Sequence, residues 1–275
     1  MAVNLSDALE VATRSDTGRV RPHNEDSVFV DRELGLALLA DGMGGYNAGE
    51  VASSMATRLM ASGLANAFAQ RGADRRVAES QTWVQAALVE EVARTNATIH
   101  EAAANQPQYS GMGTTLVAAI FHDNLVTVAH AGDSRLYRLR DWELGLLTRD
   151  HSVLQEQIDD GAITVEQARQ SKYKNLLTRA LGVDPEVDVA IGDWDARPGD
   201  QFLLCSDGLT DMVADDQIAM TMLEFGADPE QCASRLVDLA NENGGRDNIS
   251  VVLLKVKRAF PAQHTWWRRM LAWFR

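Results

Sequence analysis

The amino-acid sequence predicts an α+β fold in which two antiparallel sheets pack face to face and helices lie outside each sheet. Three observations support this prediction. Short apolar segments joined by brief turns, as in residues 111–148, are typical of antiparallel strands rather than of βαβ units. Two long helical patterns, at residues 48–70 and 77–104, separate two blocks of strands. A polar insertion near residues 150–185 interrupts the second block and predicts a flap over a site.

The individual elements follow from local patterns taken in chain order. Strands are expected at residues 9–16, 28–30, 36–40, 114–121, 125–131, 135–139, 143–148, 202–206 and 249–256. Helices are expected at residues 48–70, 77–104, 153–160, 164–172, 214–224 and 229–243. One apolar face of the first long helix contains Val51, Met55 and Leu59. The predicted buried face of the second long helix contains Val84, Leu88, Val92 and Ile99.

The composition is that of a globular domain followed by a short tail. The 275 residues are 45% hydrophobic, and no Pro- or Ser-rich linker divides them, so residues 1–257 are expected to form one domain and residues 258–275 a tail. Two cysteines cannot form a disulfide framework, which fits a reducing compartment. Because the sequence shows neither a signal-peptide pattern nor an apolar run near the ~18 residues of a spanning helix, the predicted location is cytoplasmic.

The charge of the chain is unevenly distributed. Of the 26 basic residues, six lie in residues 255–275, which contain no acid. The rest of the chain therefore carries 20 basic and 39 acidic residues, a net charge of −19. Such a domain is not expected to bind nucleic acid through its general field. An anionic substrate can still bind where metal ions invert the local potential.

Carboxylates occur where apolar strands begin or end, and four stretches share this design: Asn24-Glu25-Asp26, Asp41-Gly42, Asp207-Gly208 and Asp247-Asn248. Taken singly, such an acid is as often a turn or cap residue. Together they can converge at one edge of a sheet sandwich, where clustered carboxylates repel one another unless cations neutralise them. An all-oxygen ligand set suits Mg²⁺ or Mn²⁺. Two such ions about 4 Å apart are a standard arrangement for in-line attack on phosphorus.

These stretches, in this order, resemble the metal-dependent protein phosphatase family (type 2C) in its short bacterial form. The similarity extends over residues 9–256 or so. Further matching motifs are Ser15-Asp16-Thr17-Gly18, Gly111-Met112-Gly113-Thr114-Thr115, Ala131-Gly132-Asp133-Ser134-Arg135, Asp150-His151-Ser152 and Leu177-Thr178-Arg179-Ala180-Leu181-Gly182. The resemblance implies a four-layer αββα sandwich with a dinuclear Mn²⁺ or Mg²⁺ centre at one edge.

The resemblance also implies the metal ligands. Asp41 is expected to bridge the two ions. Asp207 and Asp247 are expected to bind the first ion. The backbone carbonyl of Gly42 and the carboxylate of Glu25 are expected to bind the second, Glu25 directly or through water.

Other site residues are implied in the same way. Asp133 matches the acid that helps to bind a third, weaker ion in bacterial members of the family. Arg21 is expected to grip two phosphate oxygens with its planar fork, and Asp26 to hold metal-bound water. Asn248 is expected to orient Asp247 or water. Some family members carry a histidine general acid at the position of Met43, so a metal-bound water is the candidate proton donor here.

The function implied by the resemblance is that of a bacterial signalling enzyme. It would hydrolyse phosphoserine and phosphothreonine on proteins by in-line attack of a metal-bridging water. Its expected partners are phosphoproteins and a cognate serine/threonine kinase, and the chain is expected to be a monomer. Two alternatives stay open: a non-catalytic pseudophosphatase that binds phosphoproteins, and a hydrolase of small phosphoesters with the same metal centre.

The C-terminal tail, residues 258–275, lies beyond the family pattern. Three of the chain's six tryptophans, Trp266, Trp267 and Trp273, lie there among arginines. On a helix these residues form a broad apolar face with basic residues around the rest. Such a segment suits peripheral contact with an anionic membrane or with a partner's groove, and it equally suits packing on the domain's own core.

Overall fold

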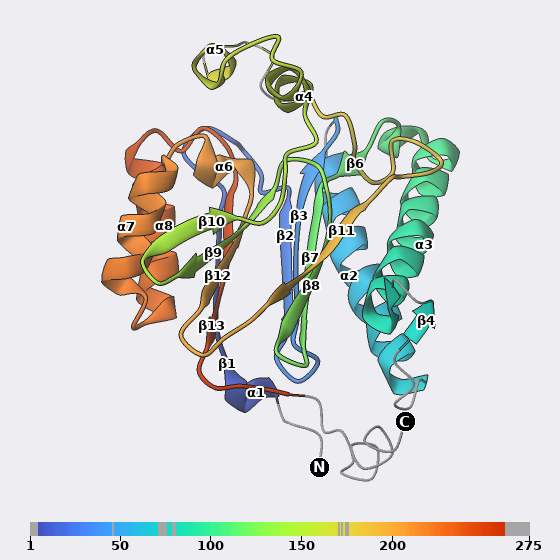
Figure 1. Cartoon of the computed structure of the whole chain (residues 1–275). Coiled ribbons are helices and arrows are strands. Elements are labelled where there is room, and N and C mark those ends of the chain that lie inside the picture. The colour runs from blue at the N-terminus through green and yellow to red at the C-terminus, as the bar shows by residue number, and fades with distance from the viewer. Residues whose placement is uncertain are drawn as a thin grey trace.

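The computed structural model describes residues 5–261, apart from residues 46, 71–75, 79–80, 170, 172 and 174–175. Within these ranges two large antiparallel sheets stand face to face in the middle of the molecule (Figure 1). Helices lie outside each sheet, so the layers follow the order helix, sheet, sheet, helix. This arrangement confirms the predicted four-layer αββα sandwich.

The first sheet contains the two ends of the described domain. Its strands, in order of pairing, are β1 (Leu9–Asp16), β13 (Ile249–Val256), β12 (Gln201–Cys205), β9 (Arg135–Arg140) and β10 (Glu143–Leu146). The register between β1 and β13 runs without interruption from Leu9 opposite Val256 to Asp16 opposite Ile249. Helices α7 (Asp215–Phe225) and α8 (Pro229–Glu242) cover the outer face of this sheet (Figure 1).

The second sheet carries the two long helices on its outer face. Its strands are β11 (Ala190–Asp195), β8 (Leu125–Ala131), β7 (Leu116–His122), β3 (Leu36–Met43) and β2 (Asp26–Asp31), and the short β6 (Gly113–Thr114) also pairs with β3. The covering helices are α2 (Ala48–Gln70) and α3 (Trp83–Asn105) (Figure 1). Three short helices lie elsewhere in the described chain: α1 (Leu5–Ala8), α6 (Asp207–Thr210) and the 3₁₀ helix η1 (Pro107–Tyr109).

The continuous apolar strands are explained by burial on both faces. Successive side chains of a strand point to opposite sides of a sheet. In β3, Ala37 and Leu39 pack in the core between the sheets, whereas Leu36 and Leu38 pack against the helices. In β13, alternate residues likewise divide between the core that separates the sheets and the core beneath α7 and α8. Such strands place polar residues only at their ends.

Three local predictions were inaccurate. Helix α3 begins at Trp83, because residues before it form a short hairpin of β4 (Arg76–Ala78) and β5 (Gln81–Thr82). The predicted apolar face of α2 packs partly buried against the core at Val51 and Met55, and the fully buried residues lie on the neighbouring face, which was not predicted: Ala52, Ala56, Met60 and Leu64. Small alanine side chains allow the helix to lie close to the sheet. Strand β11 was not predicted, since a glycine and two aspartates interrupt its pattern.

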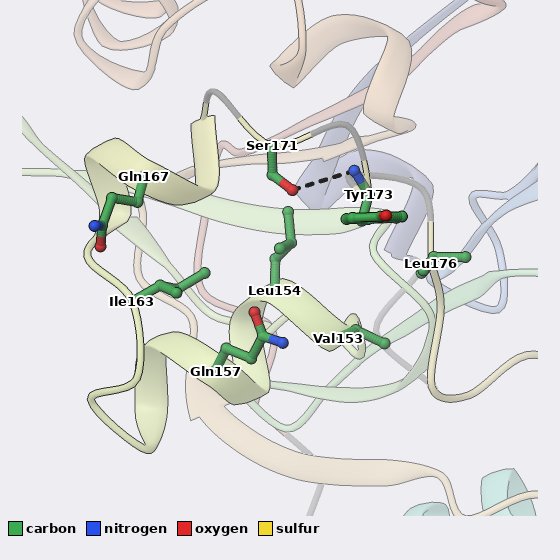
Figure 2. A pocket seen from close by; sticks show the side chains of 8 residues that line it. All are labelled: Val153, Leu154, Gln157, Ile163, Gln167, Ser171, Tyr173 and Leu176. Atoms are coloured by element: carbon green, nitrogen blue, oxygen red, sulfur yellow. Dashed lines mark hydrogen bonds between the residues drawn. The ribbon is translucent and has the colours of Figure 1, made fainter.

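The polar insertion forms the predicted flap. Helices α4 (Val153–Asp159) and α5 (Val165–Arg169) stand above one end of the sandwich (Figure 1). Ser152 caps α4, and its Oγ accepts a hydrogen bond from the backbone nitrogen of Gln155 at 3.2 Å. The flap contains a cavity of about 340 Å³, and Figure 2 shows the side chains that line it. Its lining is mostly apolar and consists of Val153, Leu154, Gln157, Ile163, Gln167, Ser171, Tyr173 and Leu176.

The end of the described chain still packs on the domain. Phe260 is buried against Phe121, with ring centroids 6.3 Å apart, and its backbone nitrogen donates to Asn124 Oδ1 at 2.7 Å. Residues 262–275, which hold the tryptophans of the tail, lie outside the described residues, so the interpretation of the tail stays a prediction. Among the described residues, no helix has both the length and the apolar character needed to cross a membrane.

Candidate active site

Strand ends bring the predicted acids to one end of the sandwich, beneath the flap. Asp41 lies near the end of β3, directly opposite Asp26 at the start of β2. Asp207 follows β12 at the start of α6, and Asp247 precedes β13. The pKa of Asp41 lies well above its usual range, first because of burial and then because of the charges of Asp26, Asp207, Asp133 and Asp247. The predicted carboxylates therefore act on one another in a single site.

Buried hydroxyl groups hold Asp41 and Asp26 in place. The backbone nitrogen of Asp41 donates to Thr115 Oγ1 at 3.0 Å, and Thr114 Oγ1 donates to the carbonyl of Asp41 at 2.9 Å. Ser206 Oγ donates to Asp26 Oδ2 at 2.8 Å. The sequence patterns assigned no role to these three hydroxyls, although Thr114 and Thr115 belong to a motif that carries the resemblance and Ser206 directly precedes Asp207.

Asp26 combines burial with an incomplete set of partners. Burial raises its pKa to about 6, against hydrogen bonds from serine hydroxyls that lower it. In the described part of the chain, its Oδ1 atom is buried without a hydrogen-bond partner. A buried carboxylate oxygen of this kind is costly unless a cation, a water or a proton satisfies it.

Asp207 and Asp133 form the other side of the site. Burial, followed by the charges of Asp133 and Asp247, raises the pKa of Asp207 well above its usual range. Burial and the charge of Asp150 raise the pKa of Asp133 to about 6. Asp133 lies in the connection from β8 to β9, where Gly132 adopts φ +105°. A Cβ atom there would also approach Thr115 Cγ2 to 2.6 Å, so both the backbone angle and the space require glycine.

Gly42 brings the predicted ligands of the second ion together. Its backbone nitrogen donates to the carbonyl of Glu25 at 3.1 Å. A Cβ atom at Gly42 would lie 2.0 Å from the carbonyl oxygen of Gly49, in the first turn of α2. The carboxyl group of Glu25 lies against Gly49 from the same side. Burial raises the pKa of Glu25, and the charge of Arg21 opposes this shift. The carboxylate of Glu25 and the Gly42 peptide therefore border one space.

Asn248 fixes the loop that carries two predicted site residues. Its side-chain nitrogen donates to the carbonyls of Thr17 and His23 at 3.0 and 2.8 Å, and its Oδ1 accepts from the backbone nitrogen of Glu25 at 2.8 Å. Contact with Asp247 comes instead from the backbone nitrogen of Asn248, which donates to Oδ1 at 2.9 Å. The Asn248 side chain thus positions the loop of residues 17–25.

Arg21 lies in the site and pairs with a predicted metal ligand. Its Nη2 atom donates to Asp247 Oδ2 at 2.6 Å. This hydrogen bond raises the pKa of Arg21. The guanidinium group is about half exposed and has five N–H donors, so most of them remain for a phosphate. Arg21 also places a cationic group near the acids Glu25 and Asp207.

Substitution of Arg21 by alanine is expected to raise KM for phosphopeptides by roughly tenfold, since a charge-assisted hydrogen bond contributes about 1.5–3 kcal/mol. We expect a smaller fall in kcat. Steady-state kinetics with a phosphothreonine peptide measure both. Arg19→Ala, in the same loop, is the matched control and is expected to leave both constants near their original values. Equal kinetics for Arg21→Ala and the control would remove Arg21 from the phosphate site.

The donor chemistry of the site fits divalent cations. Within the described residues, no three His, Cys, Asp or Glu side chains are already arranged as a metal-ligand set. The site nevertheless consists of oxygen donors. Burial, followed by the charges of neighbouring acids, raises the pKa values of Asp41 and Asp207, and Asp26 Oδ1 has no partner among the described residues. Hard cations such as Mg²⁺ and Mn²⁺ prefer such donors and relieve such repulsion.

The site thus consists of buried acids at one edge of an αββα sandwich. Comparison with known families then gives a definite assignment, since the family model described as "Protein phosphatase 2C" matches residues 19–241. The chain belongs to the protein phosphatase 2C family. This confirms the resemblance inferred from the sequence motifs.

Similar proteins come from several bacteria. The chain is 42% identical over 250 residues to the serine/threonine protein phosphatase PstP of Mycobacterium tuberculosis, with 90% of this chain and 45% of PstP covered. It therefore spans about half the length of that relative. It is 40% identical over 245 residues to the serine/threonine phosphatase stp of Listeria monocytogenes, with 88% of this chain and 94% of the relative covered.

Solved structures extend the comparison to the fold. The catalytic domain of PstP in complex with two manganese ions is 40% identical, with a TM-score of 0.77 and coverage of 90% of this chain and 98% of that one. The serine/threonine phosphatase Stp1 of Staphylococcus aureus is 32% identical, with a TM-score of 0.79 and coverage of 90% and 95%. The likeness therefore covers the whole sandwich, not only the acid motifs.

Proposed function

We propose that the chain is a metal-dependent serine/threonine protein phosphatase that hydrolyses phosphoserine and phosphothreonine on proteins. The convergence of buried carboxylates at the edge of a protein phosphatase 2C fold carries this proposal. It is clearest at Asp41, whose pKa is raised by burial and then by the charges of four neighbouring acids. The names of the bacterial relatives support the substrate class.

The proposed ligand set contains the predicted acids. Asp41 would bridge two Mn²⁺ or Mg²⁺ ions, with Asp207 and Asp247 on one and with Glu25 and the Gly42 carbonyl on the other. When bound, the ions supply a water of lowered pKa and neutralise charge on the phosphoryl oxygens. The manganese complex of the PstP catalytic domain supports this assignment. Asp133, on the Asp207 side, would help to hold a third, weaker ion.

The side chains of the protein hold the reacting groups in place. Asp26 would bind a water through Oδ1, because its other oxygen is already held by Ser206. Arg21 would grip two oxygens of the substrate phosphate and leave the side of phosphorus opposite the leaving oxygen open to in-line attack. Asn248 would hold Arg21 and Glu25 in position, because its three hydrogen bonds fix the loop that carries them. Orientation of this kind accounts for a large part of the rate gain in phosphoryl transfer.

Two alternative functions are less well supported. A pseudophosphatase would be expected to have lost one or more of the metal-binding acids, and all of those predicted are present. A hydrolase of small phosphoesters would use the same centre, and only the substrate separates it from a protein phosphatase.

A substrate panel tests the proposal. In Mn²⁺, we expect phosphate release from phosphothreonine and phosphoserine peptides with kcat/KM at least about tenfold above that for phosphorylated sugars or nucleotides, because flanking residues add binding energy. Preference for small esters would favour the second alternative. Phosphopeptide binding without release of phosphate from any substrate would favour the first.

Further proposals rest on the family or on the sequence, and not on the site. We propose a cognate serine/threonine kinase whose products the enzyme reverses, a cytoplasmic location, a monomeric state and a domain limit near residue 257. For the tail we propose contact with an anionic membrane or a partner protein, based on its tryptophans and arginines.

A further inference from the structure

A groove of about 620 Å³ opens from the predicted metal centre. It lies between the flap and the segment that contains α6 and the start of α7, which face one another in Figure 1. Asp133 and Asp207, two of the predicted site residues, line this groove. Residues next to a phosphorylated side chain that reaches these acids can therefore enter the groove.

The lining of the groove is strongly acidic. Among the described residues that line it there are five aspartates, Asp133, Asp150, Asp207, Asp211 and Asp215, and one basic residue, Arg135. Arg135 is bound to Asp150 through two hydrogen bonds of 2.8 and 2.6 Å, and its Nη1 atom lies 4.0 Å from Asp215. One guanidinium group cannot balance five carboxylates. Metal ions would neutralise the end near Asp133 and Asp207, which leaves negative charge farther along the groove.

Asp215 is held in position and accessible to solvent. Its Oδ1 atom accepts a hydrogen bond from the hydroxyl of Tyr137 at 2.9 Å, while 62% of its side chain is exposed. A carboxylate fixed in this way loses little conformational freedom when it binds a cation. The groove also contains Leu146, Ile158 and Met212. Apolar walls of this kind suit the aliphatic stem of a lysine or arginine, whose charged end then reaches a carboxylate.

From this geometry we infer that the groove selects phosphoprotein substrates with lysine or arginine close to the phosphorylated residue, and that Asp215 is a specificity-determining residue. The inference rests on the proposed protein phosphatase function. A simpler role for Asp215 is to stabilise the first turn of α7 through the helix dipole, which Asp216 also does. That role would not depend on the sequence of the substrate.

Matched peptides test the inference. Two phosphothreonine peptides differ only in carrying lysine or glutamate on both sides of the phosphothreonine, so that either chain direction places the charge in the groove. The readout is the ratio of their kcat/KM values in Mn²⁺, with p-nitrophenyl phosphate as a substrate that reports only on the metal centre. We expect the wild type to prefer the lysine peptide. Asp215→Asn should lower the ratio by about two- to fivefold, the usual size of an exposed ion pair.

Charge reversal gives the sharpest outcome. Asp215→Lys is expected to prefer the glutamate peptide and to hydrolyse p-nitrophenyl phosphate at the wild-type rate. Asp216→Asn is the matched control, because it removes an acid from the same helical turn but not from the groove, and it should keep the wild-type ratio. An unchanged ratio in Asp215→Lys, or an equal change in the control, would overturn the inference. Absence of hydrolysis of both peptides by the wild type would instead overturn the proposed function, and the inference with it.

Discussion

Asp41→Asn and Asp207→Asn are each expected to abolish phosphatase turnover without unfolding the protein. Both carboxylates are placed among the metal ligands, and an amide binds a divalent cation far less strongly than a carboxylate. We expect kcat to fall by at least roughly 10³-fold, as when a group that stabilises transition-state charge is removed. Initial rates on a phosphothreonine peptide at saturating Mn²⁺ measure the loss. Asp216→Asn, an exposed acid on α7, is the control that should retain activity.

The same variants should be at least as stable as the wild type in chelator. Burial and neighbouring acids raise the pKa values of Asp41 and Asp207, so their charged forms destabilise the metal-free fold at neutral pH. Removal of one charge relieves this repulsion, and thermal unfolding in EDTA should show an equal or higher Tm. Near wild-type kcat at saturating Mn²⁺ would show that the ligand assignment is wrong. A large fall in Tm would mean that the lost activity reports unfolding instead.

Chelation is expected to remove the activity of the wild type, and Mn²⁺ or Mg²⁺ to restore it. Among the described residues the acids of the site outnumber the nearby cations Arg21 and Arg135, so the reaction depends on added positive charge. Metal binding should also stabilise the fold by about 2.7 kcal/mol at a concentration 100-fold above Kd. Thermal unfolding measures this without reference to activity. Full activity of a protein shown by metal analysis to be metal-free would exclude the proposed chemistry.

The metal-free protein should respond to pH in a defined direction. Asp26 and Asp133 have folded-state pKa values of about 6, above the usual range of an aspartate. The folded state therefore binds more protons than the unfolded state between about pH 6 and pH 4, and these groups increase stability as pH falls through that window. In saturating Mn²⁺ the effect should be absent or reversed, because protons then compete with the metal. An identical pH dependence with and without Mn²⁺ would contradict the proposed metal site.

The sequence was most informative for segments whose burial determines their secondary structure. The apolar segments of β3 and β13 predicted strands buried on both faces, and the acid at the end of each followed from the need to leave the core. Buried positions of α3 such as Leu88 and Ile99 were also predicted correctly from their spacing. These features depend on local periodicity, which a sequence shows directly.

Other features depend on contacts between distant segments, which periodicity does not show. The pairing of Arg21 with Asp247 joins the two ends of the domain. The hydrogen bonds from Asn248 to the loop of residues 17–25 join the same two regions, so its contact with that loop was not predicted. The hydroxyl of Ser206 on Asp26 is of the same kind. The resemblance to a family predicted that the acids converge in one site. Local patterns alone would have allowed the acids to be separate turn or cap residues.

The register of β1 with β13 has a consequence for how the protein is made. Strand β1 forms its ladder with β13, at the other end of the domain, and β13 also lies between β1 and β12. A growing chain on the ribosome therefore holds the apolar side of β1 without its partner until residues 249–256 have been synthesised. Contacts between residues so distant in sequence make folding slow. Until they form, the apolar surface of the strand is exposed and can aggregate with other chains. Asp247 reaches the site in that same final step, so a nascent chain has no complete centre before its first sheet closes.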